Sequence, residues 1–342
     1  MTTSTQSTRV ATGFAAYTRS FEDSGVPLLG HLVVYSVFEN RITPDVLASW
    51  FAELELDTDF LPGPIRACDA FEKVTGRDGV RLTYELDNHS ASAGSRRSAT
   101  LMIRHVRRDD SGLVRHLVRE VRDEARTQLD YDTHLAECLF RRAPSPHSPS
   151  GAGTLRIEPD HNRIATLPFR EQDQVYTMLE KIDEVYRARC RYLTGDRLRT
   201  LVRSYVEHLD AVKVRDTGGV YFVHHGHADT LARLRQLVAR MGSGSTLNRV
   251  PIPAQDEMRE MIAEAFTRQA KDNLDRLARD IAKARESGAS PKAIETLYRR
   301  FRSVQASAAQ HSELLATTLT DTNTALETVK LQFGGLLNAN AA

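Results

Sequence analysis

The sequence predicts an α+β protein in three parts: an N-terminal mixed part with a β-meander, a central winged-helix-like α/β part, and a C-terminal antiparallel helical hairpin that forms a coiled coil. Three observations predict it. Short β-branched and aromatic runs between turn residues occupy residues 1–142, a Pro-, Ser- and Gly-rich stretch follows at 143–153, and long helical apolar patterns fill 255–342. We therefore expect domains at 1–142, 154–254 and 255–342, with 143–153 as a linker.

The composition is that of an ordinary globular protein. The 342 residues are 41% hydrophobic and 27% charged, with a mean hydropathy of −0.41. No run approaches the apolar length of a membrane-spanning helix, and the N-terminus lacks the residue order of a signal peptide. The three cysteines are widely separated, which favours a reducing compartment over a disulfide framework. We expect a cytoplasmic bacterial protein without a membrane partner.

The N-terminal part begins with a strand and a helix. Residues 30–39 are rich in β-branched and aromatic side chains, and Thr43 and Pro44 suit the start of the helix that follows. Three further apolar runs between residues 80 and 142 indicate a β-meander, with a hairpin turn at 109–112. A helical stripe through the same region stays open as the alternative: Leu113, Leu117, Val121, Ala125 and Leu129.

The central part has the element order of a winged helix. Helical patterns cover 171–193 and the residues after Thr194, and a strand, turn and strand follow at 211–223. A third helix is predicted from Asp229 to Met241, followed by one more strand. In a winged helix, one helix enters a groove of the nucleic acid while the hairpin touches its backbone.

Basic side chains concentrate in this central part. Residues 171–250 hold 13 basic and 10 acidic side chains. Arginines on such a helix and hairpin are expected to contact phosphates of DNA or RNA. The predicted nucleic-acid-binding residues are Arg187, Arg189, Arg191, Arg197, Arg199, Arg203, Lys213 and Arg215. The alternative is a solvated face on which these cations pair with nearby carboxylates.

The C-terminal part contains two predicted helices. The first covers 255–286, SGASP at 287–291 stops it, and Ser290 and Pro291 suit the start of the second. Apolar residues then recur every three or four positions through five heptads, as in a coiled-coil seam. The predicted oligomerisation residues are Ile294, Leu297, Phe301, Val304, Leu315 and Val329. We expect a homo-oligomer, and the alternative is that the seam packs onto its own domain.

The sequence contains no catalytic motif of a known class, so we predict no catalytic residues and no cofactor. His224, His225 and His227, followed by Asp229, are the closest approach to a metal cluster. Adjacent side chains of a strand point to opposite faces, so these histidines are not expected to converge on one ion. A metal-dependent hydrolase is therefore the least favoured reading, and we predict no metal site.

Three stretches carry a resemblance to known sequences. ITPDVLASWFAELELD and LPGPIRACDAFEKVTG lie near the start, and TGDRLRTLVRSYVEHLDAVKVRDTGGVYFV lies in the middle. Their general pattern resembles an uncharacterised family of actinobacterial and actinophage proteins. The resemblance implies a bacterial cytoplasmic setting related to phages or mobile elements, and it implies no activity.

Two functions follow as expectations. The first is a non-enzymatic protein that contacts nucleic acid through the central arginines and self-associates through its C-terminal helices. The second is a structural scaffold or oligomeric assembly subunit that does not bind nucleic acid. The sequence leaves open whether the N-terminal part holds a ligand pocket.

Overall fold

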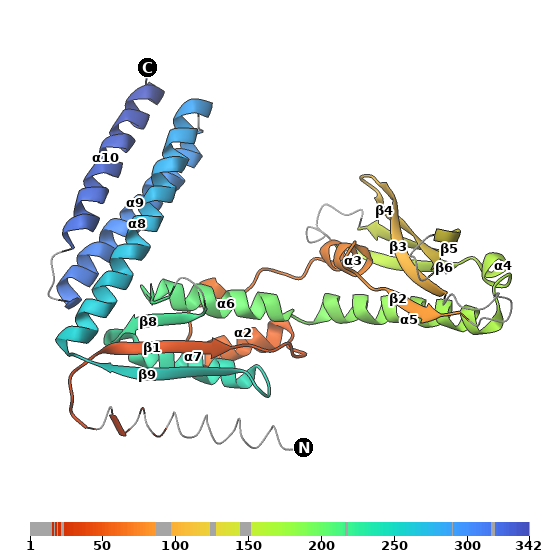
Figure 1. Cartoon of the computed structure of the whole chain (residues 1–342), viewed down its shortest axis with the longest axis horizontal. Helices are drawn as coiled ribbons and strands as arrows, with labels where there is room; N and C mark the ends of the chain where they lie inside the picture. Colours follow the sequence, from red (N-terminus) through yellow and green to blue (C-terminus); the bar gives the residue numbers. More distant parts are fainter. Residues whose placement is uncertain are drawn as a thin grey trace. The chain divides into compact units, whose positions relative to one another are not determined.

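The chain forms two compact units (Figure 1). The structure, a computed structural model, describes residues 24–86, 97–123, 128–143, 152–215, 218–288, 290–315 and 319–341, together with Ala16, Thr18, Ser20 and Phe21. Unit 1 contains residues 1–40, 45–61 and 195–342, and unit 2 contains 41–44 and 62–194. The α+β class is confirmed, since both units combine a sheet with helices.

Unit 1 is built on a four-stranded antiparallel sheet in the order β7-β8-β1-β9. The strands are β1 (Leu28–Ser36), β7 (Val212–Lys213), β8 (Val220–His224) and β9 (Thr246–Pro253). The Gly-Gly turn between β7 and β8 lies where the sequence predicts it. The N-terminal strand β1 is central, however, and Leu32 pairs with both Phe222 and Val250. Residues 154–254 are therefore not a separate winged-helix domain, because their sheet is incomplete without β1.

Helices cover one face of this sheet. They are α2 (Pro44–Glu53), α6 (Gly195–His208) and α7 (Ala228–Arg240), with the short 3-10 turns η1 (Thr58–Phe60) and η2 (His225–His227). The predicted helix at Pro44 is confirmed. Val33 of β1, Leu198 of α6 and Leu234 of α7 are fully buried. A buried layer of this kind is the main source of favourable folding free energy.

The described residues of the C-terminal part form three helices, rather than the predicted two. They are α8 (Asp256–Ser287), α9 (Pro291–Leu315) and α10 (Thr320–Ala341). The first boundary agrees with the prediction: Gly288 adopts a left-handed conformation after α8, and the Ser290 hydroxyl accepts a hydrogen bond from the amide of Ala293. The predicted hairpin is corrected because α9 ends at Leu315 and Leu319, directly before α10, is not helical; residues 316–318 lie outside the described part of the chain.

Unit 2 contains a five-stranded antiparallel sheet in the order β2-β3-β4-β5-β6. Its strands are β2 (Leu82–Glu85), β3 (Ser98–Arg108), β4 (Gly112–Arg122), β5 (Gln128–Arg142) and β6 (Gly153–Pro159). Helices α3 (Ala67–Thr75), α4 (His161–Ile164) and α5 (Phe169–Arg191) complete the unit. The meander is confirmed and the helical alternative is excluded, because Leu113, Leu117 and Val121 lie on β4; Ala125 lies outside the described residues.

The predicted linker at 143–153 does not separate domains. Arg141 pairs with Thr154 across β5 and β6, and the amide of Ala143 donates to the carbonyl of Ala152. This stretch therefore connects two neighbouring strands of one sheet, and residues 144–151 within it lie outside the described part of the chain. Its composition is as typical of a long hairpin loop as of a linker. The actual boundaries lie near residues 41–45, 61 and 194.

Candidate functional site

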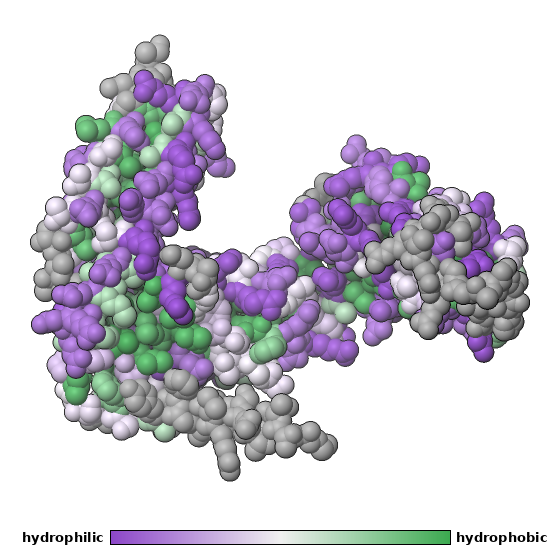
Figure 2. Space-filling view, in the orientation of Figure 1, coloured by the Kyte–Doolittle hydropathy of each residue, from purple (hydrophilic) through white to green (hydrophobic). Residues whose placement is uncertain are grey.

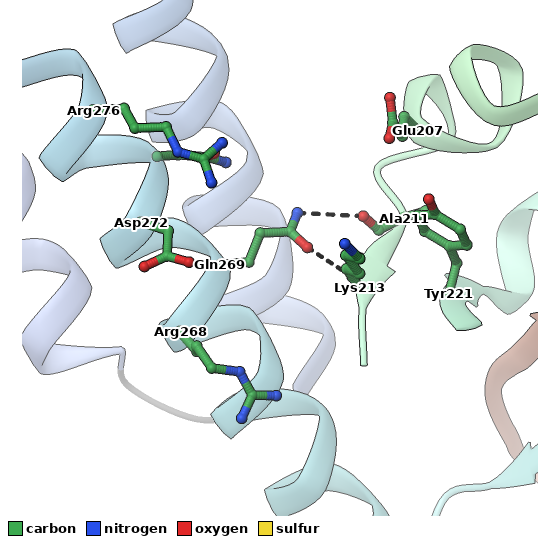
Figure 3. A pocket seen from close by; sticks show the side chains of 9 residues that line it. Glu207, Ala211, Lys213, Tyr221, Arg268, Gln269, Asp272 and Arg276 are labelled. Atoms are coloured by element: carbon green, nitrogen blue, oxygen red, sulfur yellow. Dashed lines mark hydrogen bonds between the residues drawn. The ribbon is translucent and has the colours of Figure 1, made fainter. Parts of the chain in front are cut away.

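A polar pocket of about 540 Å³ opens in unit 1 between helix α8 and the strands β7 and β8 (Figure 3). Helix α6 contributes at its C-terminal end. The lining residues are Glu207, Ala211, Lys213, Tyr221, Arg268, Gln269, Asp272, Asn273 and Arg276. Five of them come from α8, where the spacings of three and four residues place them on one face of the helix.

Gln269 fixes α8 against the sheet edge at the floor of the pocket. Its side-chain oxygen accepts a hydrogen bond from the backbone amide of Lys213 at 2.6 Å, and its nitrogen donates to the carbonyl of Ala211 at 3.4 Å. Arg268 also reaches the edge, donating to the carbonyl of Val214 at 3.0 Å. Strand β7 is at the edge of its sheet, so these side chains pair backbone groups that lack a neighbouring strand.

The pocket lining carries more positive than negative side chains. Lys213, Arg268 and Arg276 are cations, and Glu207 and Asp272 are the carboxylates. Within the described residues, neither Lys213 nor Arg276 has a carboxylate in ion-pair contact, and the Arg276 guanidinium points into the open space (Figure 3). Cations held on a helix and an adjacent strand, without a carboxylate partner, are suited to binding an anion.

Tyr221 lines the pocket on the sheet side, and Tyr35 stacks on it. The rings of Tyr35 and Tyr221 are stacked with centroids 6.3 Å apart. Burial, followed by the neighbouring Tyr221, raises the pKa of Tyr35 to about 12, although the positive charge of Arg203 acts in the opposite direction. Burial also raises the pKa of Tyr221. Both phenols therefore keep their protons at neutral pH and present no negative charge to an anion.

The predicted basic residues of unit 1 lie around this pocket or on helix α6. Lys213 lines the pocket, and Arg203 acts electrostatically on Tyr221 and on Tyr35 beside it. Arg199 instead makes internal contacts, to Asp196 at 2.6 Å and to the carbonyl of Val37 at 3.0 Å. The remaining two residues are Arg197, which lies on α6, and Arg215, which is exposed after β7.

The other three predicted arginines lie on helix α5 of unit 2. Arg187 is exposed and pairs with Asp183 at 2.8 Å, one turn earlier on the helix. The guanidinium of Arg191 lies 5.5 Å from the ring centre of Tyr192, and Arg189 is half-buried near the same helix end. The eight predicted residues are thus divided between the two units, and the sequence alone does not reveal this division.

Most predicted oligomerisation residues are buried within the chain. Leu297, Phe301 and Val329 are each less than 9% exposed and belong to one apolar core formed by α8, α9 and α10 with the sheet. Ile294 and Val304 pack against that core, and the side chain of Leu315 lies outside the described part of the structure. The seam is therefore covered by the chain's own helices, because the break before α10 allows a third helix to fold back.

The rings of His224 and His225 lie with their centroids 4.0 Å apart, rather than on opposite faces as predicted, because β8 ends at His224 and η2 begins at His225. Nδ1 of His224 accepts a hydrogen bond from the amide of Gly226 at 3.2 Å, and burial together with His225 lowers the pKa of His224 to about 4. In the described residues, the one group with metal-ligand spacing lies elsewhere, in the unit 2 sheet, and consists of His116, His134 and Glu137. Sequence reasoning did not find that group.

Sequence reasoning also missed the two arginines that α8 contributes to the pocket. Arg268 and Arg276 are eight residues apart and lie on the polar side of an amphipathic helix. That spacing is ordinary for a solvated helix face, so no local signal distinguishes them. They become a site only because Gln269 places this face beside β7.

Comparison with known protein families gives a match. The model of a family of unknown function (DUF6744) matches residues 28–342. No curated protein and no solved structure matches the chain. Separately, no helix in the described part of the chain is both long and apolar enough to cross a bilayer.

Proposed function

We propose, for this chain that belongs to the DUF6744 family of unknown function, a non-enzymatic role in binding nucleic acid through the pocket beside α8. The observation that carries the proposal is that Lys213, Arg268 and Arg276 line one open, polar surface pocket. Phosphodiester groups are the anions that such surface cations commonly contact, and they do so without reading sequence. A bacterial, phage-related and cytoplasmic setting is part of the same proposal.

The arrangement suits contact with a phosphate backbone rather than readout of bases. Arginine and lysine bind phosphate oxygens directly, and the phenol groups of Tyr35 and Tyr221 stay protonated and uncharged at neutral pH. Tyr221 is only 6% exposed, which leaves little ring surface for stacking on a base. We therefore expect affinity that depends strongly on salt and weakly on sequence.

A binding assay with charge-reversed pocket variants tests the proposal. Fluorescence anisotropy with labelled duplex and single-stranded oligonucleotides at about 50 mM salt should show binding by the wild-type chain. The double variant Lys213→Glu/Arg276→Glu should weaken it by about tenfold or more. It should also reduce the slope of log affinity against log salt by about 2, because two phosphates would no longer be neutralised by the protein.

Two further variants make this assay specific. Arg299→Glu/Lys330→Glu changes the net charge equally, at exposed positions of α9 and α10 outside the pocket, and should bind nearly as wild type. The double variant Arg189→Glu/Arg191→Glu measures how much the basic C-terminal end of α5 contributes to the affinity for nucleic acid. The proposal is abandoned if the wild-type chain binds none of the DNA or RNA probes at low salt. It is also abandoned if Arg299→Glu/Lys330→Glu loses as much affinity as Lys213→Glu/Arg276→Glu.

An assembly role is a second proposal, favoured by an exposed apolar sheet face in unit 1. Leu32 faces Phe222 across β1 and β8, on the side where Phe222 joins the core with the C-terminal helices. The same face continues to Val34, which lies opposite Val220 and is 42% exposed. Figure 2 shows apolar surface over this part of the sheet. Exposed apolar patches next to a core often mark protein interfaces.

Light scattering tests the assembly role. We expect the wild-type chain to have a mass in solution above the 38.3 kDa of one copy. Val34→Asp should reduce that mass to one copy, because a carboxylate cannot be buried in an apolar interface without a large desolvation cost. Val106→Asp, at a 47% exposed site in unit 2, is the matched control and should not change it. A wild-type chain that stays monomeric at all concentrations and salts removes this role.

A further inference from the structure

Two neighbouring strands of the unit 2 sheet bring three metal-ligand side chains together. His116 on β4 is the register partner of Glu137 on β5, so both side chains lie on the same face. His134 is also on β5, three residues before Glu137. The ligand atoms of these three side chains all lie within 4.8 Å of one another.

An irregularity in the sheet explains how His134 joins the other two. In a regular strand, residues three apart point to opposite faces. Between β4 and β5, however, Leu117 pairs with Ala136 while Arg119 pairs with Asp132, so two steps on β4 correspond to four on β5. The extra residues form a bulge that turns His134 toward the face of Glu137. Bulges that redirect a side chain are common at functional sites.

The local geometry is close to that of a metal site. Nε2 of His116 is 3.7 Å from a carboxylate oxygen of Glu137, and the rings of His116 and His134 have centroids 4.2 Å apart. All three side chains are half-buried. Burial, followed by His134, lowers the pKa of His116, which favours the neutral imidazole that a metal ion requires. Two adjacent imidazoles and a carboxylate then offer lone pairs to one point.

A second carboxylate, that of Asp160, lies next to His134. An oxygen of Asp160 lies 3.7 Å from Nδ1 of His134, while the other oxygen of Asp160 accepts the amide hydrogen of Arg163 at the start of α4. Asp160 is thereby held in place by the helix that it caps. Carboxylates in this position commonly orient a metal-bound histidine by accepting the hydrogen of its other ring nitrogen.

We propose that His116, His134 and Glu137 bind one divalent transition-metal ion, with Asp160 orienting His134. Two imidazole nitrogens and one carboxylate suit zinc, cobalt, nickel or copper, whereas magnesium and calcium prefer an all-oxygen set. Bonds of about 2.0–2.2 Å require the ligand atoms to close to roughly 3.5 Å from one another. Side-chain rotation of the half-buried His and Glu residues supplies this movement. Three protein ligands leave at least one coordination position for water or another ligand.

Titration of the full chain, prepared without a histidine tag and stripped with a chelator, tests the site. Cobalt(II) should bind at one ion per chain with visible absorption bands of a nitrogen- and oxygen-ligated ion, and zinc should displace it. A tenfold excess of magnesium should not displace the cobalt. His116→Ala and His134→Ala should each weaken zinc binding by about tenfold or more, measured by competition with a chelating dye.

Matched controls separate this site from adventitious binding. His105→Ala removes an exposed histidine of the neighbouring strand β3 and should leave affinity and stoichiometry unchanged. Glu137→Gln keeps the side-chain volume and the fold but removes the ligand charge, so it should also weaken binding. The proposal is overturned if the wild-type chain binds no cobalt at one equivalent, or if the His105 variant loses as much affinity as the His116 and His134 variants.

Discussion

Replacing Arg119 with methionine should lower the free energy of unfolding of unit 2 by about 3–5 kcal/mol. Arg119 is only 6% exposed, and its guanidinium lies 2.6 Å from Glu171 and 3.0 Å from Asp132. Glu171 is 9% exposed and also accepts a hydrogen bond from the hydroxyl of Tyr84. The methionine variant leaves the Glu171 carboxylate buried with the Tyr84 hydroxyl but without its cation, which is far more costly than the loss of an exposed ion pair.

The pKa shifts in this network also indicate that its members stabilise one another. Burial by itself lowers the pKa of Arg119, but the contacts with Tyr84 and Glu171 outweigh burial, so the pKa of Arg119 rises above its usual value. Burial and the hydrogen bond to Glu171 likewise raise the pKa of Tyr84. The burial of Arg119, Tyr84 and Glu171 inside unit 2 therefore depends on the contacts that these side chains make with one another. The network links β2, β4 and β5 to the first turn of α5.

A double-mutant cycle measures how strongly the pair is coupled. Arg119→Met and Glu171→Leu should each destabilise, whereas the double variant should recover much of the loss, because two apolar side chains of similar volume replace two charges. Arg104→Met removes a 53% exposed arginine of β3 and should cost less than about 1 kcal/mol. Circular dichroism melts and amide exchange in β3–β5 report the changes. Additive losses in the double variant would contradict the coupling.

Features that depend on neighbouring residues were predictable from the sequence. The hairpin turn between β3 and β4 uses Asp109, whose carboxylate accepts the amide hydrogens of Ser111 and Gly112. The stop after α8 uses a left-handed Gly288 and a Ser290 cap. Such signals act within four or five residues, so one sequence contains all the information that they need.

Features that depend on distant residues were not predictable. Strand β1 carries a clear strand pattern, but nothing in it shows that it lies between β8 and β9, about 190 and 220 residues later. The bulge that turns His134 toward His116 comes from the pairing of two strands. Arg276 lies on an ordinary polar helix face until Gln269 joins that face to β7. In each case, long-range pairing creates the site, and periodicity does not encode it.

The heptad seam shows where a correct pattern led to an incomplete conclusion. The apolar stripe through α9 is real, since Leu297 and Phe301 are buried. An apolar stripe predicts that one face of the helix is buried, but it does not identify the element that buries that face. The fold covers it with α8 and α10 of the same chain. The expectation of a partner chain at this seam rested on reading α9 and α10 as one continuous helix.

Replacing Phe301 with alanine should therefore destabilise the isolated chain, by about 3–5 kcal/mol. Phe301 is 4% exposed, and its ring centre lies 5.7 Å from that of Phe333 on α10. The variant leaves a cavity where α9 and α10 meet in the core they share with α8 and Ile252 of the sheet. Melting followed by circular dichroism and by the fluorescence of Trp50, the single tryptophan of the chain, should shift to lower temperature.

The concentration dependence of this melt distinguishes an internal core from an interface between chains. Because the residues around Phe301 belong to the same chain, the shift in melting temperature should be the same at low and high protein concentration, whereas a seam between chains would melt at a higher temperature as concentration rises. Leu331→Ala, at a 77% exposed position of α10, is the matched control and should change stability by less than about 0.5 kcal/mol. A Phe301 variant as stable as the Leu331 variant would show that α9 does not pack in this way, and would return the seam to the role of an oligomer interface.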